Sequence, residues 1–234
     1  MVCALSPRLF WPGAVGQGAT PAASGPCRWE RAESLTCGEP DAVIVVLDEA
    51  RAELDLAGGG LRCAGCGGSL RPWGYARTRR LRGPDGTVLP LRPRRVHCRP
   101  CRTGHVLLPA WAPPRRADTI EVIGAGLLAS AAGTSDRRVA ETLAIPPATV
   151  RGWRRRAGAR TERLRALAWR WALECDPCLP VPDPTGSDLG DALNILGLAA
   201  AAIVRRLGIA HTAAPWPLIA VISHGQLLGP VPDY

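Results

Sequence analysis

The stretch Cys63-Ala-Gly-Cys66-Gly-Gly, together with Cys98-Arg-Pro-Cys101 further along, decides the fold that we expect for this chain of 234 residues. Each short C-x-x-C loop lets two sulfur atoms converge on one ion, and two such pairs can close a tetrahedron around Zn²⁺. The two glycines after Cys66 suit a knuckle whose backbone N–H groups turn toward sulfur. We therefore predict a closed, structural zinc site whose ligands are Cys63, Cys66, Cys98 and Cys101.

The two cysteine pairs are separated by 31 residues, which exceeds the usual gap of a simple zinc ribbon. A β-hairpin explains the excess, with strands at Trp73–Arg82 and Thr87–His97 around the turn residues Gly83-Pro84-Asp85-Gly86. A third strand at Thr103–Leu108 would complete a three-stranded zinc ribbon. Two prolines in the second strand indicate that it is an edge strand or an irregular one.

Positive charge is confined to the middle of the chain. The formal net charge is +9, and all 29 basic residues are arginine. Residues 61–116 carry a net +12 and residues 117–172 a net +5, whereas residues 1–60 and 173–234 each carry −4. A concentrated basic field favours phosphate backbones and releases condensed counterions on binding. The alternative is a solvated surface from an arginine-rich, GC-rich genome, but the segregation of the charge favours nucleic acid.

A helical period over 118–132 predicts a first helix in the second basic block. Thr134 or Ser135 can cap a second helix at Asp136–Leu143, and Pro147 suits the first position of a third. A helix-turn-helix unit needs a small residue at the helix contact, a compact turn and apolar residues at fixed offsets. The residues in these positions are Val139, Ala140, Leu143, Ala144, Ile145, Val150 and Trp153. The alternative is an ordinary helical hairpin.

The third helix would be the one that reads DNA, because the second helix of a helix-turn-helix unit enters the major groove. It is expected to present one set of residues to the base edges: Ala148, Thr149, Arg151, Gly152 and Arg155. Three further arginines would contact phosphates: Arg154, Arg156 and Arg160. The ribbon is expected to add five arginines to the DNA-binding surface: Arg77, Arg79, Arg80, Arg94 and Arg95.

Two aromatic residues, Trp73 and Tyr75, alternate with arginines in the first hairpin strand. Aromatic rings among arginines can stack on the bases of a nucleic acid. The alternative is that these rings form the small core of the ribbon, and we favour that alternative for Trp73.

The chain holds nine cysteines and shows no secretory signal, which predicts a cytoplasmic, nucleoid-associated protein with reduced thiols. Its longest dense apolar run, Ala192–Val204, is too short to cross a bilayer. C-x-x-C pairs in this setting are more often metal ligands than disulfides, and neither pair of the quartet opens a helix as a redox pair would. A third pair, Cys175-Asp-Pro-Cys178, is interpreted as two thiols rather than a second metal site.

Composition divides the chain into six segments that together predict an α+β fold. They are a disordered extension (1–40), a short strand and helix (41–60), the zinc ribbon (61–116), the helix-turn-helix domain (117–174), a proline-rich linker (175–186) and a C-terminal helical segment (187–234). An amphipathic run at Thr161–Glu174 can continue the third helix across Gly158. The apolar middle of a last helix at Ser187–Leu207 predicts a homodimer, since helix-turn-helix proteins often bind paired half-sites.

Four runs of sequence carry a resemblance to known proteins. Arg62-Cys-Ala-Gly-Cys-Gly-Gly-Ser-Leu-Arg-Pro-Trp-Gly-Tyr-Ala and Pro93-Arg-Arg-Val-His-Cys-Arg-Pro-Cys resemble the N-terminal zinc ribbon of insertion-sequence transposases. Thr103-Gly-His-Val-Leu-Leu-Pro and Val150-Arg-Gly-Trp-Arg-Arg-Arg resemble more closely a related family of short helix-turn-helix proteins from high-GC bacteria, over residues 42–230. The resemblance implies the same four cysteine ligands, a recognition helix at Pro147–Ala157 and a complete chain.

The expected function is therefore sequence-specific binding of double-stranded DNA, by a transcriptional regulator or a transposon-derived accessory factor that is not an enzyme. One alternative is an active transposase, which needs three spaced carboxylates holding two Mg²⁺ ions. The acids after the linker are clustered at Asp183, Asp188 and Asp191, and their segment has a helical pattern. A second alternative is a redox or adaptor protein that uses its thiols.

Overall fold

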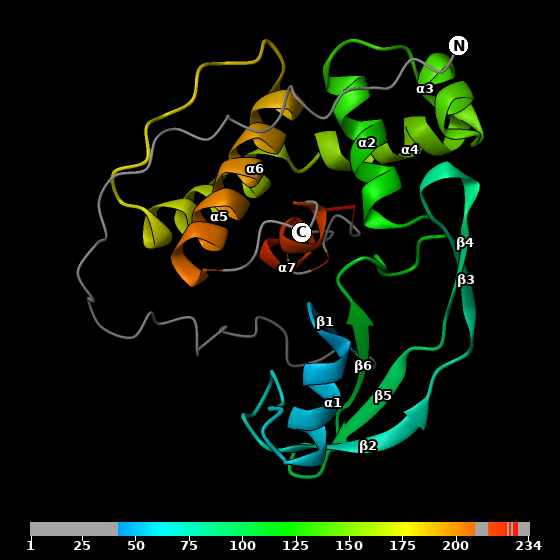
Figure 1. Ribbon diagram of the computed structural model, residues 1–234, viewed down its shortest axis with the longest axis vertical. Helices are drawn as coiled ribbons and strands as arrows, with labels where there is room; N and C mark the ends of the chain where they lie inside the picture. The colour runs from blue at the N-terminus through cyan, green and yellow to red at the C-terminus, as the bar shows by residue number, and fades with distance from the viewer. Residues whose placement is uncertain (1–41, 209–214, 224, 226, 229–234) are drawn as a thin grey trace.

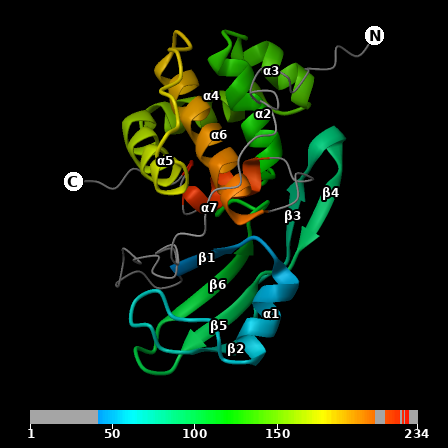
Figure 2. The same ribbon diagram turned by 60° about the vertical axis from the view of Figure 1, so that its left-hand side comes forward.

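The computed structural model describes residues 42–208, 215–223, 225 and 227–228 (Figure 1). A small sheet lies at one end of the molecule and a group of helices at the other, as two views show (Figures 1 and 2). The predicted mixed α+β class is confirmed. The predicted disordered extension 1–40, with Cys3, Cys27 and Cys37, lies outside the described residues.

The sheet at the lower end has four strands rather than the three predicted. Their order is β1-β6-β5-β2, with β1 at Ala42–Val46, β6 at Gly104–Pro109, β5 at Arg94–Cys98 and β2 at Leu70–Tyr75. Strand β1 runs parallel to β6, and the other pairs are antiparallel. The three-stranded prediction is wrong because strand propensity identifies an extended segment but does not name its distant partner. Strand β1 pairs its backbone N–H and carbonyl groups with those at the edge of β6.

Helix α1 (Glu49–Ala57) lies against this sheet. Asp48 caps its start by accepting a hydrogen bond from the backbone N–H of Arg51 at 2.9 Å. Leu56 is buried in one apolar cluster with Leu70 and Val96 of the sheet. The predicted lead-in segment therefore contributes both an edge strand and a packing helix to the fold around the cysteines.

The long hairpin predicted between the cysteine pairs forms, but it is broken into two parts. Its lower part is the β2–β5 pair, and its upper part is a separate two-stranded sheet of β3 (Arg79–Arg82) and β4 (Val88–Leu91). A single-turn 3₁₀ helix, η3 (Pro84–Gly86), forms the tip. The ladder is irregular between Pro72 and Tyr75, and Pro93 lies between β4 and β5. Proline has no N–H to donate, so continuous strands across these positions are not formed.

Six helices make up the upper half of the described chain. They are α2 (Ile120–Ala131), α3 (Asp136–Leu143), α4 (Pro147–Gly158), α5 (Thr161–Cys175), α6 (Asp188–Leu207) and α7 (Trp216–Ile222). Ser135, rather than Thr134, caps α3 and accepts from the N–H of Arg138 at 3.4 Å. The extension of the third helix across Gly158 is wrong, because the chain turns at Ala159 and Arg160 before α5 begins.

The apolar stripe of α6 is buried within the chain itself. Leu196, Ala199 and Ala200 are fully buried in the core that α6 shares with α2, α5 and α7. The apolar middle of the helix is thus explained by intramolecular packing, and homodimerisation stays a prediction. No helix in the described ranges has the length and apolar character needed to span a membrane.

Arginines of the upper hairpin tie it to the helical half. Arg82 of β3 forms an ion pair with the buried Asp118 at 2.8 Å and donates to the carbonyl oxygen of Ala144 at 3.3 Å. Burial raises the pKa of Asp118, although the Arg82 guanidinium opposes this rise. Arg79 donates to the carbonyl oxygens of Pro113 and Arg116. The hairpin therefore bridges the cysteine-bearing sheet and the turn between α3 and α4.

A close approach between α2 and α7 depends on a glycine. A Cβ at Gly124 would lie 2.1 Å from the indole ring of Trp216, which is itself buried. Real Cβ atoms do not approach other atoms so closely, so any side chain at this position must displace the ring. Gly124 thus permits the seating of α7 on α2.

We expect Gly124→Ala to lower the free energy of unfolding by up to about 2 kcal/mol. Overpacking against Trp216 costs roughly 1–3 kcal/mol, which exceeds the gain of about 1 kcal/mol in helix propensity. The matched control is Gly158→Ala in α4, where an added Cβ meets nothing within 4 Å. Urea denaturation followed by circular dichroism should show the control unchanged or slightly more stable. Equal stabilisation by both substitutions would contradict the packing described here.

Candidate functional site

The four predicted cysteines converge at the base of the hairpin. Their sulfur atoms all lie within 4.8 Å of one another. Cys63 Sγ is 3.6 Å from Cys101 Sγ, and Cys66 Sγ is 3.4 Å from Cys98 Sγ. These separations exceed the disulfide bond length of about 2.05 Å and approach the ~3.8 Å edge of a tetrahedron with metal–sulfur bonds of about 2.3 Å. The quartet can therefore hold a metal ion.

Local hydrogen bonds shape the two cysteine loops. In the first loop the N–H of Cys63 donates to the carbonyl oxygen of Gly68 at 2.7 Å, and the N–H of Gly67 donates back to that of Cys63 at 2.9 Å. In the second loop the N–H of Cys98 donates to the carbonyl oxygen of Thr103 at 2.9 Å. Pairing of β2 with β5 then brings the two loops together, because Leu70 lies opposite Cys98.

Gly68 is required where the two loops approach each other. A Cβ at this position would lie 2.8 Å from Pro100 Cγ and 3.2 Å from Cys98 Sγ. Any larger residue would push the second loop away from the first. The sequence pattern predicts small residues here to let N–H groups turn toward sulfur, and the structure adds contact between the loops as a further reason.

Burial and hydrogen bonds shift the pKa values of the thiols in opposite directions. It raises the pKa of Cys63, and it raises that of Cys98 to about 12. Hydrogen bonds from Thr103 instead lower the pKa of Cys101 to about 6. A divalent cation among the sulfurs would reverse the effect of burial, because its charge deprotonates coordinating thiols. The buried pair of thiols is thus poorly suited to carrying negative charge without a nearby cation.

Two histidines near the second loop have different surroundings. His105 is buried, and its Nε2 lies 3.3 Å from Cys63 Sγ. His97 instead lies against Trp73, with ring centroids 5.4 Å apart. Because the four thiols already converge, we interpret His105 as a neighbour of Cys63 rather than as a metal ligand. The hydrogen bond of a neighbour can orient a metal ligand.

Helices α3 and α4 form the compact pair that the sequence predicts. The buried residues at their contact are Val139, Ala140, Ile145, Val150 and Trp153, while Leu143 is half-buried. Ala144, the first of the three residues between the helices, has the left-handed conformation with φ 52° and ψ 46°. An L-residue other than glycine seldom adopts it, so this turn is held by its surroundings. One of those contacts is the hydrogen bond from Arg82.

The surface of α4 carries most of the residues predicted to contact DNA. Ala148, Arg151, Arg154 and Arg155 are exposed, and Thr149 and Arg156 are half-buried. The predicted exposure of Gly152 is wrong: it is buried, and an added Cβ would lie 2.9 Å from the guanidinium of Arg156. Arg160 is also buried, against prediction, and burial lowers its pKa.

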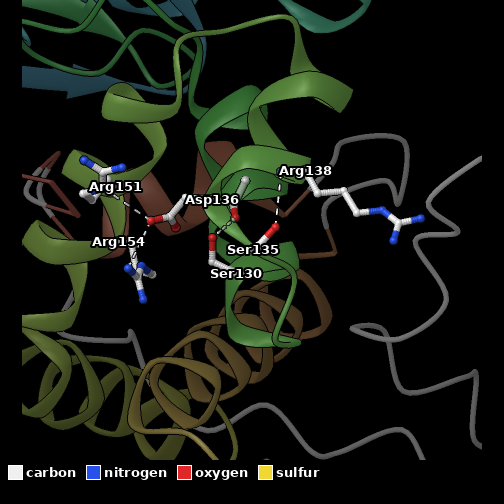
Figure 3. Close-up of polar contacts among 7 residues, drawn as sticks. Ser130, Ser135, Asp136, Arg138, Arg151 and Arg154 are labelled. Atoms are coloured by element: carbon white, nitrogen blue, oxygen red, sulfur yellow. Dashed lines mark hydrogen bonds and ion pairs between the residues drawn. The ribbon is translucent and has the colours of Figure 1, made fainter.

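An acidic residue of α3 holds two arginines of α4. Asp136 Oδ2 lies 3.1 Å from Arg154 Nη2 and 3.8 Å from Arg151 Nε, and Figure 3 shows both side chains directed toward it. Arg138 points away from this group (Figure 3). Asp136 is absent from the residues predicted from sequence, because its partners follow 15 and 18 residues later, beyond the reach of helical periodicity.

The five ribbon arginines divide into two groups. Arg77 and Arg80 are exposed as expected. Arg79 is engaged by two backbone carbonyls, and Arg94 forms an ion pair with Glu53 at 3.2 Å. Arg95 lies over the ring of Trp73 at 4.5 Å. Arg79 and Arg94 therefore hold parts of the fold together rather than lying free on the surface.

The core position favoured for Trp73 is wrong. Its side chain is 54% exposed, on the edge strand β2. The core of the sheet is built instead from smaller residues: Leu56, Leu70, Val96 and Leu107, with Cys63 and Cys98. The register of β2 against β5 shifts between Pro72 and Tyr75, so alternation along the strand does not predict which side chains are buried.

The third cysteine pair lies apart from the quartet. Cys175 ends α5, and Cys178 is exposed in the following loop. In the part of the chain that the structure describes, the quartet is the one group of three or more cysteine, histidine or acidic side chains placed to hold a metal ion. The interpretation of Cys175 and Cys178 as thiols outside a metal site stays a prediction.

Comparisons with known proteins do not identify the site. No protein-family model, curated protein or solved structure matches this chain. The function is therefore inferred from the residues and contacts described above.

We expect the purified protein to bind one thiophilic divalent metal ion, and Cys66→Ser to weaken that binding by at least tenfold. Removal of one sulfur leaves a metal held by three thiolates and a weaker oxygen ligand. Cys178→Ser is the matched control, because Cys178 is also exposed but lies outside the quartet. Mass spectrometry of bound metal after dialysis against a weak chelator measures the difference. Equal metal content in the two variants would contradict the assignment.

Proposed function

We propose that this protein binds double-stranded DNA sequence-specifically, as a transcriptional regulator or a transposon-derived accessory factor. In this proposal α3, the turn at Ala144 and α4 form a helix-turn-helix unit, and α4 is its recognition helix. A structural Zn²⁺ held by Cys63, Cys66, Cys98 and Cys101 supports the unit through the hairpin.

The observation that carries the proposal is the exposed face of α4. A compact helix pair with a buried contact presents Ala148, Arg151 and Arg155 along this face. Arginine can pair bidentately with guanine, and a small side chain such as alanine allows close approach to the groove. Thr149, half-buried beside them, carries a methyl group that can meet thymine. Ala148, Thr149 and Arg151 lie on the N-terminal and middle turns of α4, which enter the groove in helix-turn-helix proteins, and Arg155 lies on its last turn.

Phosphate contacts are assigned to arginines around this face. Arg154 and Arg156 lie on the same helix, and Arg77 and Arg80 are exposed on the hairpin side. The ion pair of Arg154 with Asp136 is partly exposed, so it is weak and can be exchanged for a phosphate. The net +12 of residues 61–116 and +5 of residues 117–172 favour the same partner.

Zinc is proposed as the metal because four thiolates suit its tetrahedral preference. Such a closed site leaves no open position for a reacting water, so its role is structural. Binding also stabilises the folded chain, since the loops that bring the sulfurs together are not preformed in the unfolded state. The ion would fix the base of the hairpin whose upper end contacts Ala144 through Arg82.

The contacts support DNA binding better than strand transfer. A transposase site needs three carboxylates that converge on two Mg²⁺ ions. Asp191 instead accepts hydrogen bonds from the backbone N and Oγ1 of Thr185, at 2.6 and 2.8 Å, near the start of α6. The redox alternative is not favoured either, because the sulfur separations of 3.4 and 3.6 Å fit a shared ion.

Selection of bound sequences from a random pool of DNA duplexes is expected to return a defined motif. A chelator added during selection should abolish the enrichment, because loss of the ion releases the base of the hairpin. Absence of enrichment at low salt would overturn the DNA-binding proposal. A motif that persists after complete removal of the metal would overturn only the supporting role of zinc.

Arginine variants of α4 should separate base reading from phosphate contact. We expect Arg151→Ala to cost about 1–3 kcal/mol on the selected site and to relax preference at one base pair. Arg154→Ala should weaken binding to all sequences and reduce the salt slope by about 1. The control is Arg170→Ala, an exposed arginine on α5. Anisotropy titrations at several salt concentrations measure these effects, and equal losses in all three variants would indicate diffuse charge instead of a reading helix.

A further inference from the structure

Two aromatic side chains are exposed on the edge of the lower sheet. Trp73 and Tyr75, both on β2, have 54% and 49% of their surfaces exposed. Large aromatic residues are usually highly buried, because each can remove 150–250 Å² of surface from water. Among the strands that the structure describes, β2 has a neighbour on one side only, so both rings lie at an edge of the sheet.

Arginines lie over both rings. The Arg95 guanidinium is 4.5 Å from the centre of the Trp73 ring, and those of Arg92 and Arg94 are 4.8 and 4.6 Å from that of Tyr75. Such cation–π contacts orient the rings and the guanidinium planes together. We call these five residues, with His97 beside Trp73, the aromatic–arginine platform.

We propose that the aromatic–arginine platform binds single-stranded nucleic acid. Unpaired bases would stack on Trp73, Tyr75 and the guanidinium planes over them, while the charges of Arg92 and Arg95 meet the phosphates. The partner is argued from charge: the segment that carries the platform, residues 61–116, holds 13 arginines and one acid. The net charge of +12 on this segment favours an anionic partner over an apolar protein surface.

A single strand fits the platform better than a duplex. Bases in a duplex are already stacked on one another, so rings lying along a sheet edge cannot reach their faces. Unpaired bases offer both faces, and stacking on an aromatic ring tolerates any sequence. The platform therefore accounts for exposed rings that duplex recognition by α4 does not use.

The platform is also distant from the proposed recognition helix. Strands β2 and β5 lie at the lower end of the molecule, and α3 and α4 lie at the upper end in both views (Figures 1 and 2). The two surfaces can therefore bind separately. This inference goes beyond the proposed duplex binding and can fail or succeed independently of it.

The test uses the full chain loaded with metal and a fluorescent thymidine single strand of about 12 nucleotides, a length typical of one stacking module. Trp73→Ala is expected to weaken binding about tenfold to a hundredfold, the loss that removal of one stacking ring produces. Trp73→Phe keeps a ring and should retain most of the affinity. The matched control is Leu54→Ala, which removes an exposed apolar side chain from α1 and should bind like the unaltered protein.

The same variants are titrated with double-stranded DNA, and their bound metal is measured to verify folding. Unchanged duplex binding by Trp73→Ala, together with loss of single-strand binding, supports the platform. Equal single-strand affinity for Trp73→Ala and the unaltered protein overturns it, as does weakening by Trp73→Phe as severe as by Trp73→Ala. If Arg151→Ala abolishes single-strand binding while Trp73→Ala leaves it intact, the single strand binds at α4 and the platform is excluded.

Discussion

The convergence of four sulfur atoms is the constraint on which the lower half of the molecule depends. Cys66 and Cys98 are separated by 31 residues, yet their sulfurs lie 3.4 Å apart. Strand pairing brings the loops together, and the missing side chain of Gly68 lets them touch. Burial of Cys63 and Cys98 opposes thiolate formation, so a bound cation and the fold would stabilise each other.

The β3–β4 hairpin connects the cysteine-bearing sheet to the helical half of the molecule. Strands β3 and β4 extend from the sheet toward the helices. There Arg82 of β3 forms an ion pair with Asp118 and donates a hydrogen bond to the carbonyl oxygen of Ala144. Removing one partner of an ion pair that includes a buried carboxylate is costly, because the remaining charge is left without compensation. The turn between α3 and α4, with its left-handed Ala144, is thus held partly by a strand more than 60 residues earlier.

Some arginines stabilise the fold, whereas others are exposed on the surface. Arg79, Arg94 and Arg160 are engaged or buried in the fold, whereas Arg151 and Arg155 are exposed on α4. Counting charge along the sequence identifies a basic region but cannot separate these groups. Burial and specific partners separate the arginines that stabilise the fold from those that are exposed. The arginines of the aromatic–arginine platform differ from those of α4 because they lie over aromatic rings.

Features with local causes can be predicted from the amino-acid sequence. The C-x-x-C loops, a cap of α3 at Thr134 or Ser135 and the start of α4 at Pro147 involve residues within about one turn of each other, so spacing and residue type suffice. Only the tertiary structure decided the parallel partner of β1, the exposure of Trp73, the burial of Gly152 and the link from Arg82 to Ala144. These depend on which distant surfaces meet, and periodicity along a chain carries no information about distant partners.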